Sequence, residues 1–99
     1  MVIELVRFKL VEDTLVNEFT LAWQDTMPVV AEMSGFIKRE LMHNEETDEW
    51  VDLVHWESMK EAKDAAAQIS SIPAFAPFGQ MIDTTTMVMS HLQQQAAST

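Results

Sequence analysis

Six segments of regular hydrophobic periodicity follow one another in this chain, in the order strand, helix, strand, strand, helix, strand. Residues with the alternation or the β-forming composition of strands occupy 2–10, 36–43, 49–56 and 82–92. Apolar residues spaced three and four apart predict one helix after the first strand and another after the third. This order predicts an α+β protein with the ferredoxin-like βαββαβ fold, built on one antiparallel sheet.

The first helix has a start signal, a stop signal and an interruption. Asp13 is a candidate N-cap, because a short acidic side chain can accept a hydrogen bond from the first turn. Gly35 is expected to terminate the helix in the left-handed conformation. Pro28 lacks an amide hydrogen, so we expect it to kink or divide the helix near Met27.

The second helix is expected to begin after Ser58, because Ser58 and Glu61 form the capping-box pattern. Residues 73–79 follow this helix and contain two prolines, which prevent a long regular element. We expect this segment to form one tight turn that presents Phe75 and Phe78. These two rings would either cap the mouth of a cavity or seal the edge of the core.

The predicted strands carry apolar residues on both of their sides. In residues 2–10, for example, Val6 and Phe8 alternate with Ile3 and Leu5. Two helices that pack on one face of a sheet leave its other face bare. The simplest arrangement that covers the second face is a symmetric homodimer, with sheet packed against sheet.

The 99 residues fit one domain, which we expect at residues 1–92, followed by a polar C-terminal tail at 93–99. The formal net charge of −10 argues against binding to nucleic acid or to anionic membranes. The chain has no cysteine, which excludes disulfides and thiolate catalysis. Its first residues do not resemble a secretory signal and no apolar run is long enough to cross a membrane, so a cytoplasmic location is expected.

Two motifs carry a resemblance to a known family. Residues 49–58, EWVDLVHWES, end the third predicted strand in a Trp-x-Ser step into the second helix. Residues 73–78, PAFAPF, are followed by MID at the start of the last strand. Together they resemble the antibiotic-biosynthesis-monooxygenase domain of the dimeric α/β-barrel proteins, over residues 2–92. The resemblance implies two ferredoxin-like subunits that form a dimeric α/β barrel.

Members of that family include cofactor-independent oxygenases, haem-degrading enzymes and isomerases. The resemblance implies an apolar pocket for a phenolic, quinol or polyketide-like aromatic, and a monooxygenase reaction without metal or cofactor. The polyketide-oxidising members also use a tyrosine, and this chain has none. The haem-degrading members use an asparagine on the first strand and a tryptophan and histidine on the second helix, which are missing here. The alternative function is a non-enzymatic dimer that binds a ligand or a partner.

His55 is the candidate catalytic base, because it is the histidine expected on a central strand and imidazole exchanges protons near neutral pH. The alternative is a buried structural histidine. His43 and His91 are expected on opposite edge strands, so the histidines predict no metal site. Asp52 is expected to form a cross-strand ion pair with a basic residue such as Arg39 rather than to act as a base.

The candidate substrate-binding residues are four aromatic side chains: Trp50, Trp56, Phe75 and Phe78. The two tryptophans share one side of their strand, where they either line a pocket or pack under a helix. His55 alternates with Trp56, so the two point to opposite faces of a regular strand. They can line one pocket only if a bulge interrupts the strand before Ser58.

Overall fold

The computed structural model describes residues 1–98, which form a four-stranded sheet, three α-helices and one short 3₁₀-helix. The sheet order is β2-β3-β1-β4, and each strand is antiparallel to its neighbours. This topology confirms the predicted ferredoxin-like fold. The elements in chain order are β1 (Val2–Leu10), α1 (Val16–Val30), β2 (Phe36–Asn44), β3 (Glu49–Trp56), α2 (Met59–Ile69), η1 (Pro73–Phe75), α3 (Ala76–Gln80) and β4 (Ile82–Gln93).

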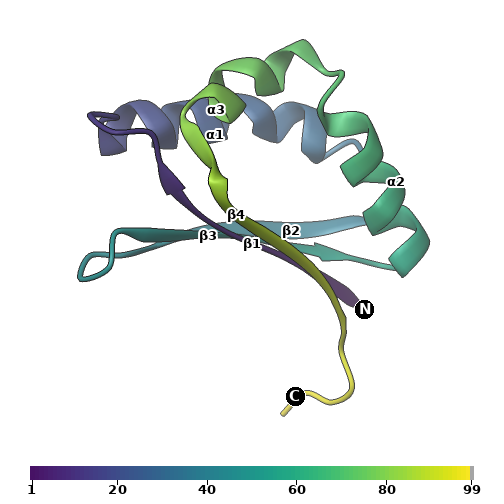
Figure 1. Ribbon diagram of the computed structural model, residues 1–99. Coiled ribbons are helices and arrows are strands. Elements are labelled where there is room, and N and C mark those ends of the chain that lie inside the picture. The colour runs from purple at the N-terminus through teal and green to yellow at the C-terminus, as the bar shows by residue number, and fades with distance from the viewer. Residues whose placement is uncertain (99) are drawn as a thin grey trace.

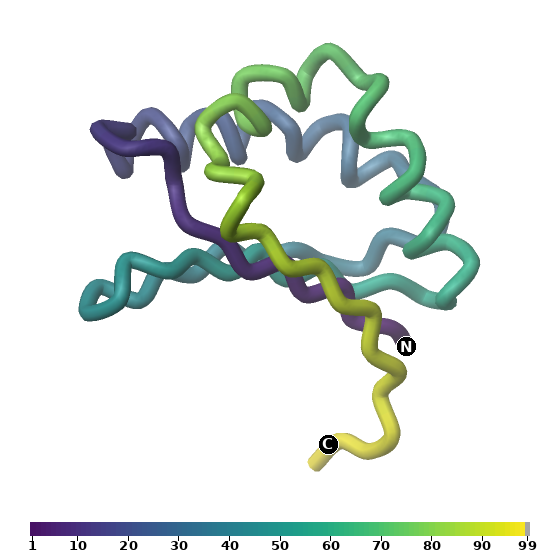
Figure 2. The backbone as a smooth tube through the Cα atoms, viewed as in Figure 1, coloured from purple at the N-terminus to yellow at the C-terminus, as the bar shows by residue number. Residues whose placement is uncertain are grey.

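The helices of the described residues all lie on one face of the sheet (Figure 1). Figure 2 shows how the chain returns at its end, so that β4 lies beside β1 along most of its length. The first and last strands thus become direct neighbours. Of the tail expected at residues 93–99, Gln93 belongs to β4 and residue 99 lies outside the described residues. No helix within residues 1–98 has the length and hydropathy needed to span a bilayer.

Burial alternates along the two central strands and defines the two faces of the sheet. Val6 on β1 and Val54 on β3 are buried beneath the helices. Leu5 and Leu53 pair with each other on the opposite face, where both remain only half-buried. In this single chain, one face therefore contributes to the core and the other remains uncovered.

The core between the helices and the sheet consists of two clusters. In the first cluster, under α1 and α3, the ring of Phe19 meets Phe8 and Trp50 edge-on and stacks on Phe78 at a centroid distance of 5.1 Å. The second cluster lies under α2 and contains Val2, Val54, Trp56, Ala62 and Ala65. Because α2 buries only two alanines of its own, it approaches the sheet without filling the space beside it.

Three expectations about α1 differ from the structure. Asp13 does not cap the helix, because the N-cap position is Leu15 and Asp13 adopts a φ of 68° in the preceding turn. Asp is one of the few residues that enter this left-handed region without a large penalty. Gly35 does not end the helix either, because α1 ends at Val30 with Ala31 in the right-handed conformation as its C-cap. Of the kink or division expected near Met27, the division does not occur, since α1 continues through Pro28 to Val30. Because Pro28 lies in the last turn, its missing amide hydrogen removes a single hydrogen bond near the helix end.

The capping box of α2 is confirmed. The Glu61 amide donates to Ser58 Oγ at 3.2 Å, and the Ser58 hydroxyl donates to Glu61 Oε1 at 3.0 Å. Glu61 Oε2 accepts a further hydrogen bond from Ser34 Oγ at 2.6 Å, which ties α2 to the loop after α1. Gly35 in that loop has a φ of +81°, and a side chain there would overlap the Glu61 carboxylate.

We expect Ser58→Ala to lower the free energy of unfolding by about 1 kcal/mol, the usual cost of losing an N-cap. Urea denaturation followed by circular dichroism measures the change. Ser70→Ala at the other end of α2 is the matched control, because the cap there uses the backbone amide of Ser70. Equal stability of Ser58→Ala and the wild type would show that the Ser58 hydroxyl does not stabilise the start of α2.

Candidate functional site

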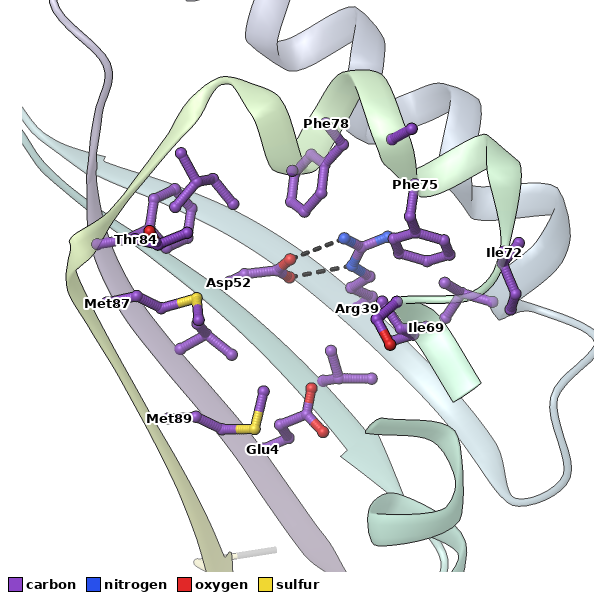
Figure 3. Close-up of a pocket in the computed structure, with 18 of the residues that line it drawn as sticks. Glu4, Arg39, Asp52, Ile69, Ile72, Phe75, Phe78, Thr84, Met87 and Met89 are labelled. Atoms are coloured by element: carbon purple, nitrogen blue, oxygen red, sulfur yellow. Dashed lines mark hydrogen bonds and ion pairs between the residues drawn. The ribbon is translucent and has the colours of Figure 1, made fainter. Parts of the chain in front are cut away.

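A cavity of about 540 Å³ lies between the sheet and the helical layer. Strands β1, β3 and β4 form its floor, and the segment from the end of α2 through α3 forms its roof (Figure 3). Its wall is mainly apolar and includes members of both core clusters, so the cavity separates the two clusters. Small-molecule sites commonly measure about 300 to 1,000 Å³ and have such apolar walls. The space is therefore adequate for one small ligand.

The roof of the cavity carries Phe75 and Phe78. The segment that holds them forms a 3₁₀ turn followed by a short α-helix, rather than the single tight turn expected from its prolines. The two rings meet edge-on with centroids 6.2 Å apart, and both are buried. Both rings line the cavity and also belong to the first core cluster, so the two roles considered for them coincide.

Trp56 lies in the cavity wall, with only 1 % of its surface exposed. Its ring meets Phe36 edge-on at a centroid distance of 6.0 Å. The indole nitrogen is buried and has no hydrogen-bond partner among residues 1–98. A buried donor without a partner is uncommon in folded proteins and calls for an acceptor that the chain itself does not supply.

Trp50 does not belong to the cavity wall. Its ring packs edge-on against Phe19 and stacks on the imidazole of His43 at a centroid distance of 4.2 Å. The pattern correctly placed Trp50 and Trp56 on the same face of β3, and both are buried there. Only the end of β3 that carries Trp56 reaches the cavity, because Trp50 lies under α1 in the first core cluster.

His55 lies on the face of the sheet opposite the cavity. Strand β3 pairs with β1 without interruption from Trp50 to Trp56, so no bulge turns His55 toward the side of Trp56. The His55 Nε2 atom is 3.4 Å from Glu40 Oε1, and it is buried without a hydrogen bond among the described residues. Because the strand has no such bulge, His55 and Trp56 point to opposite faces, as the alternation predicts, and do not line one pocket in this chain.

A buried ion pair forms the polar corner of the cavity. Arg39 holds Asp52 through two hydrogen bonds, from Nε to Oδ1 at 3.0 Å and from Nη2 to Oδ2 at 2.7 Å, as Figure 3 shows. Arg39 Nη1 also donates to Thr26 Oγ1 at 2.7 Å, and the guanidinium lies over the rings of Trp23 and Phe78. The predicted cross-strand ion pair is confirmed. Asp52 is thus a paired carboxylate rather than a free base.

Glu4 is a cavity residue that the sequence pattern did not single out as functional. It interrupts the buried side of β1, and only 4 % of its surface is exposed. The register between β1 and β4 places His91 opposite Glu4, with Oε1 and Nε2 3.1 Å apart. Burial raises the pKa of Glu4 above its usual 4.5, while the hydrogen bond and charge of His91 oppose this rise.

Within residues 1–98, no three His, Asp or Glu side chains gather into a group that would hold a metal ion. The polar residues that line the cavity include the pair formed by Arg39 and Asp52 and the acid Glu4, and the lining residue Trp56 carries a buried indole N–H without a partner among the described residues. A pattern of one buried acid in an otherwise apolar strand face is the sequence signal that could have identified Glu4. The pairing of Glu4 with His91 can be identified only when the register of β1 against β4 is known.

The chain belongs to the antibiotic biosynthesis monooxygenase family, whose model matches residues 1–70. Its structure is similar to that of SnoaB, a cofactor-independent oxygenase from Streptomyces nogalater, with a TM-score of 0.78 and 18% identity over 98% of this chain and 95% of SnoaB. It is also similar to Rv0793 from Mycobacterium tuberculosis, with a TM-score of 0.70 and 15% identity over 99% and 98% of the two chains.

A further similar structure is a dimeric protein of unknown function with a ferredoxin-like fold from Bacteroides fragilis. The TM-score is 0.66 and the identity 18%, over 94% of this chain and 95% of that chain. No significantly similar sequence was found among curated proteins. At these identities the three likenesses establish the shared fold.

The raised pKa of Glu4 predicts how Glu4→Gln changes stability with pH. The folded state holds the Glu4 proton more tightly than the unfolded state, so ionisation of Glu4 lowers the stability of the wild type as the pH rises above about 4.5. Glutamine has nearly the same shape and cannot ionise. We therefore expect the stability of Glu4→Gln, relative to the wild type, to be higher at pH 7 than at pH 4.

Chemical denaturation at the two pH values measures this difference. Asp48→Asn is the matched control, because Asp48 also pairs with a histidine, His43, but is 82 % exposed. Its stability relative to the wild type should change little between the two pH values. If the difference in stability between Glu4→Gln and the wild type is the same at both pH values, the raised pKa of Glu4 is contradicted.

Proposed function

We propose that the cavity binds a flat, mainly apolar aromatic molecule, and that the protein acts on it as a cofactor-independent monooxygenase. The substrate class is a phenolic, quinol or polyketide-like aromatic. The observation that carries this proposal is the unpartnered indole N–H of Trp56 in the apolar cavity wall. An oxygen of the bound aromatic would accept this hydrogen bond while its rings replace water against the wall. Membership of the monooxygenase family supports the same reaction.

The reaction can be written for an anthrone, whose reactive carbon is a CH₂ group conjugated with a carbonyl. A base of the site removes one proton, and the carbanion that remains delocalises its charge onto the carbonyl oxygen. The carbanion then supplies the electrons for a new C–O bond to O₂. Protonation of the resulting peroxide anion gives a hydroperoxide. Loss of water leaves a C=O group, so CH₂ and O₂ become C=O and H₂O. A hydrogen bond from Trp56 would stabilise the charge that develops on the substrate oxygen.

This proposal predicts that the protein consumes oxygen with dithranol, an anthrone, faster than dithranol oxidises alone. Trp56→Phe removes the hydrogen-bond donor and keeps an aromatic wall, so we expect kcat/KM to fall by about 10- to 100-fold. Trp50→Phe should stay within about twofold of the wild type, because Trp50 packs outside the cavity. Oxygen-electrode rates, corrected for spontaneous oxidation, measure the effect. Equal rates in all three proteins would show that Trp56 does not contribute to the reaction.

The alternative is a protein that binds such a ligand without turnover. The absence of tyrosine favours it, because the chain lacks the phenol that the polyketide-oxidising members use. The same experiment separates the two functions when it is combined with dithranol binding measured by tryptophan fluorescence. Saturable binding without oxygen uptake would favour the binding protein over the monooxygenase.

We further propose that two copies pack their uncovered sheet faces together into a homodimeric α/β barrel. Apolar side chains on this face, such as Leu5 and Leu53 on the central strands and Val88 and Leu92 on β4, are not covered by any other element of the described chain. The buried His55 Nε2 atom on the same face also lacks a hydrogen bond among those residues. A self-complementary face of this kind is typical of twofold dimers.

The dimer predicts a sedimentation mass near twice the 11.3 kDa of the chain. Leu53→Glu places a charge at the centre of the uncovered face, and we expect it to give a folded monomer at micromolar concentration. Leu21→Glu on the outer surface of α1, where Leu21 is 57% exposed, is the matched control and should remain dimeric. A wild-type monomer at the same concentration would contradict the barrel.

A further inference from the structure

We propose that Glu4 is the proton acceptor of the cavity, that His91 passes its proton to solvent, and that the ligand is an aromatic with a weakly acidic phenol or enol hydroxyl. This assignment rests on the proposed ligand-binding function of the cavity. The enol form of an anthrone carries such a hydroxyl, and its anion is the same species that reacts with oxygen. The assignment therefore identifies both the base of the site and the group on the ligand that meets it.

The position of Glu4 makes its carboxylate available to a ligand. Glu4 projects from a central strand into the cavity floor, between Val2 and Val6 on its own strand and beside Val54 on β3. Figure 3 shows its carboxylate near Met89 and apart from the paired Arg39 and Asp52. Because this setting is apolar, few water molecules compete with a ligand for hydrogen bonds to the carboxylate.

His91 lies on the outer side of Glu4. It is on edge strand β4, it does not line the cavity, and its side chain is 16% exposed. The imidazole thus lies between the carboxylate and the solvent. In the proposed transfer, the ligand O–H bond breaks, its electron pair remains on the ligand oxygen, and the proton binds Glu4. The proton then passes to His91 Nε2, and the other ring nitrogen releases a proton to water.

The charges around Glu4 support this role. The groups that act on it are His91 on β4, Asp52 on β3 and Arg39 on β2, and the last two neutralise each other in their ion pair. Burial is therefore the main influence, and it raises the pKa of the Glu4 carboxyl. A base whose pKa is closer to that of a phenol accepts its proton more readily.

Two other histidine–carboxylate pairs occur among the described residues, and they show what distinguishes this one. His43 pairs with Asp48, whose side chain is 82% exposed, and His55 faces Glu40, whose side chain is 48% exposed. Neither of these pairs lines the cavity. Only the pair of Glu4 and His91 combines a buried carboxylate in a cavity wall with a histidine that reaches solvent.

The first test measures binding of two probes of similar shape, 1-naphthol and 1-methoxynaphthalene, by tryptophan fluorescence at pH 7. The wild type should bind the naphthol about tenfold more tightly than the ether, because only the naphthol donates a hydrogen bond to the carboxylate. Glu4→Gln should reduce this preference to within about twofold, since the amide carries no charge. Asp48→Asn should keep the full preference. Circular dichroism confirms that each variant is folded.

The second test measures oxygen uptake with dithranol as a function of pH. In the wild type kcat/KM should rise with pH as Glu4 ionises, and Glu4→Gln should abolish this rise and lower the rate by about 100-fold. His91→Asn should lower the rate by about tenfold and leave the naphthol Kd within twofold, because it removes the path to solvent rather than the base.

The outcomes separate this assignment from the function on which it rests. If the wild type binds naphthol but Glu4→Gln and Asp48→Asn behave alike, Glu4 is not the acceptor and the ligand cavity stands. If the wild type binds neither probe, the ligand cavity is overturned together with the role of Glu4. If naphthol binding depends on Glu4 and no oxygen is consumed, the hydroxyl recognition stands and the monooxygenase reaction fails.

Discussion

The rest of the structure depends on the buried ion pair of Arg39 and Asp52. It joins the edge strand β2 to the central strand β3, and its hydrogen bonds and ring contacts extend to Thr26 on α1 and Phe78 on α3. Removing one partner of a buried ion pair typically costs about 3 to 5 kcal/mol, because the other charge is left without compensation. The pair therefore links α1 and α3 to the sheet, and the cavity lies in the space that this arrangement leaves open.

Under the proposed function, the cavity and its acid represent a compromise between stability and function. The small residues of α2 bring that helix close to the sheet at one end, while the aromatic cluster around Phe19 fills the other end. Between them, Glu4 and the indole of Trp56 introduce polar groups that an apolar core would avoid. Natural proteins tolerate such locally unfavourable groups where a site needs them. The cost of burying Glu4 is the same physical effect that makes it a stronger base.

Much of the candidate site could be predicted from residue patterns, and the failures have clear physical causes. The alternation of β3 correctly placed Trp56 on the helix side, and it also showed that His55 must point away unless a bulge occurred. Trp50 shares the face of Trp56 but not the cavity, because that depends on which helix lies above each position. In the sequence pattern, Glu4 was only an exception on an otherwise apolar strand face. Its significance emerged when the fold placed His91 beside it.

The sequence by itself determined the order of the elements, the faces of the strands and the capping box at Ser58, because these depend on periodicity and on contacts between residues close in the chain. Only the tertiary structure decided where α1 begins and which side chains surround the cavity. It also brought together Glu4 and His91, which are 87 positions apart. That meeting depends on the register of β1 against β4, which is set by the packing of the whole sheet and by an irregularity between Arg7 and Lys9. Local patterns carry no information about such a register, because it results from contacts across the full length of the chain.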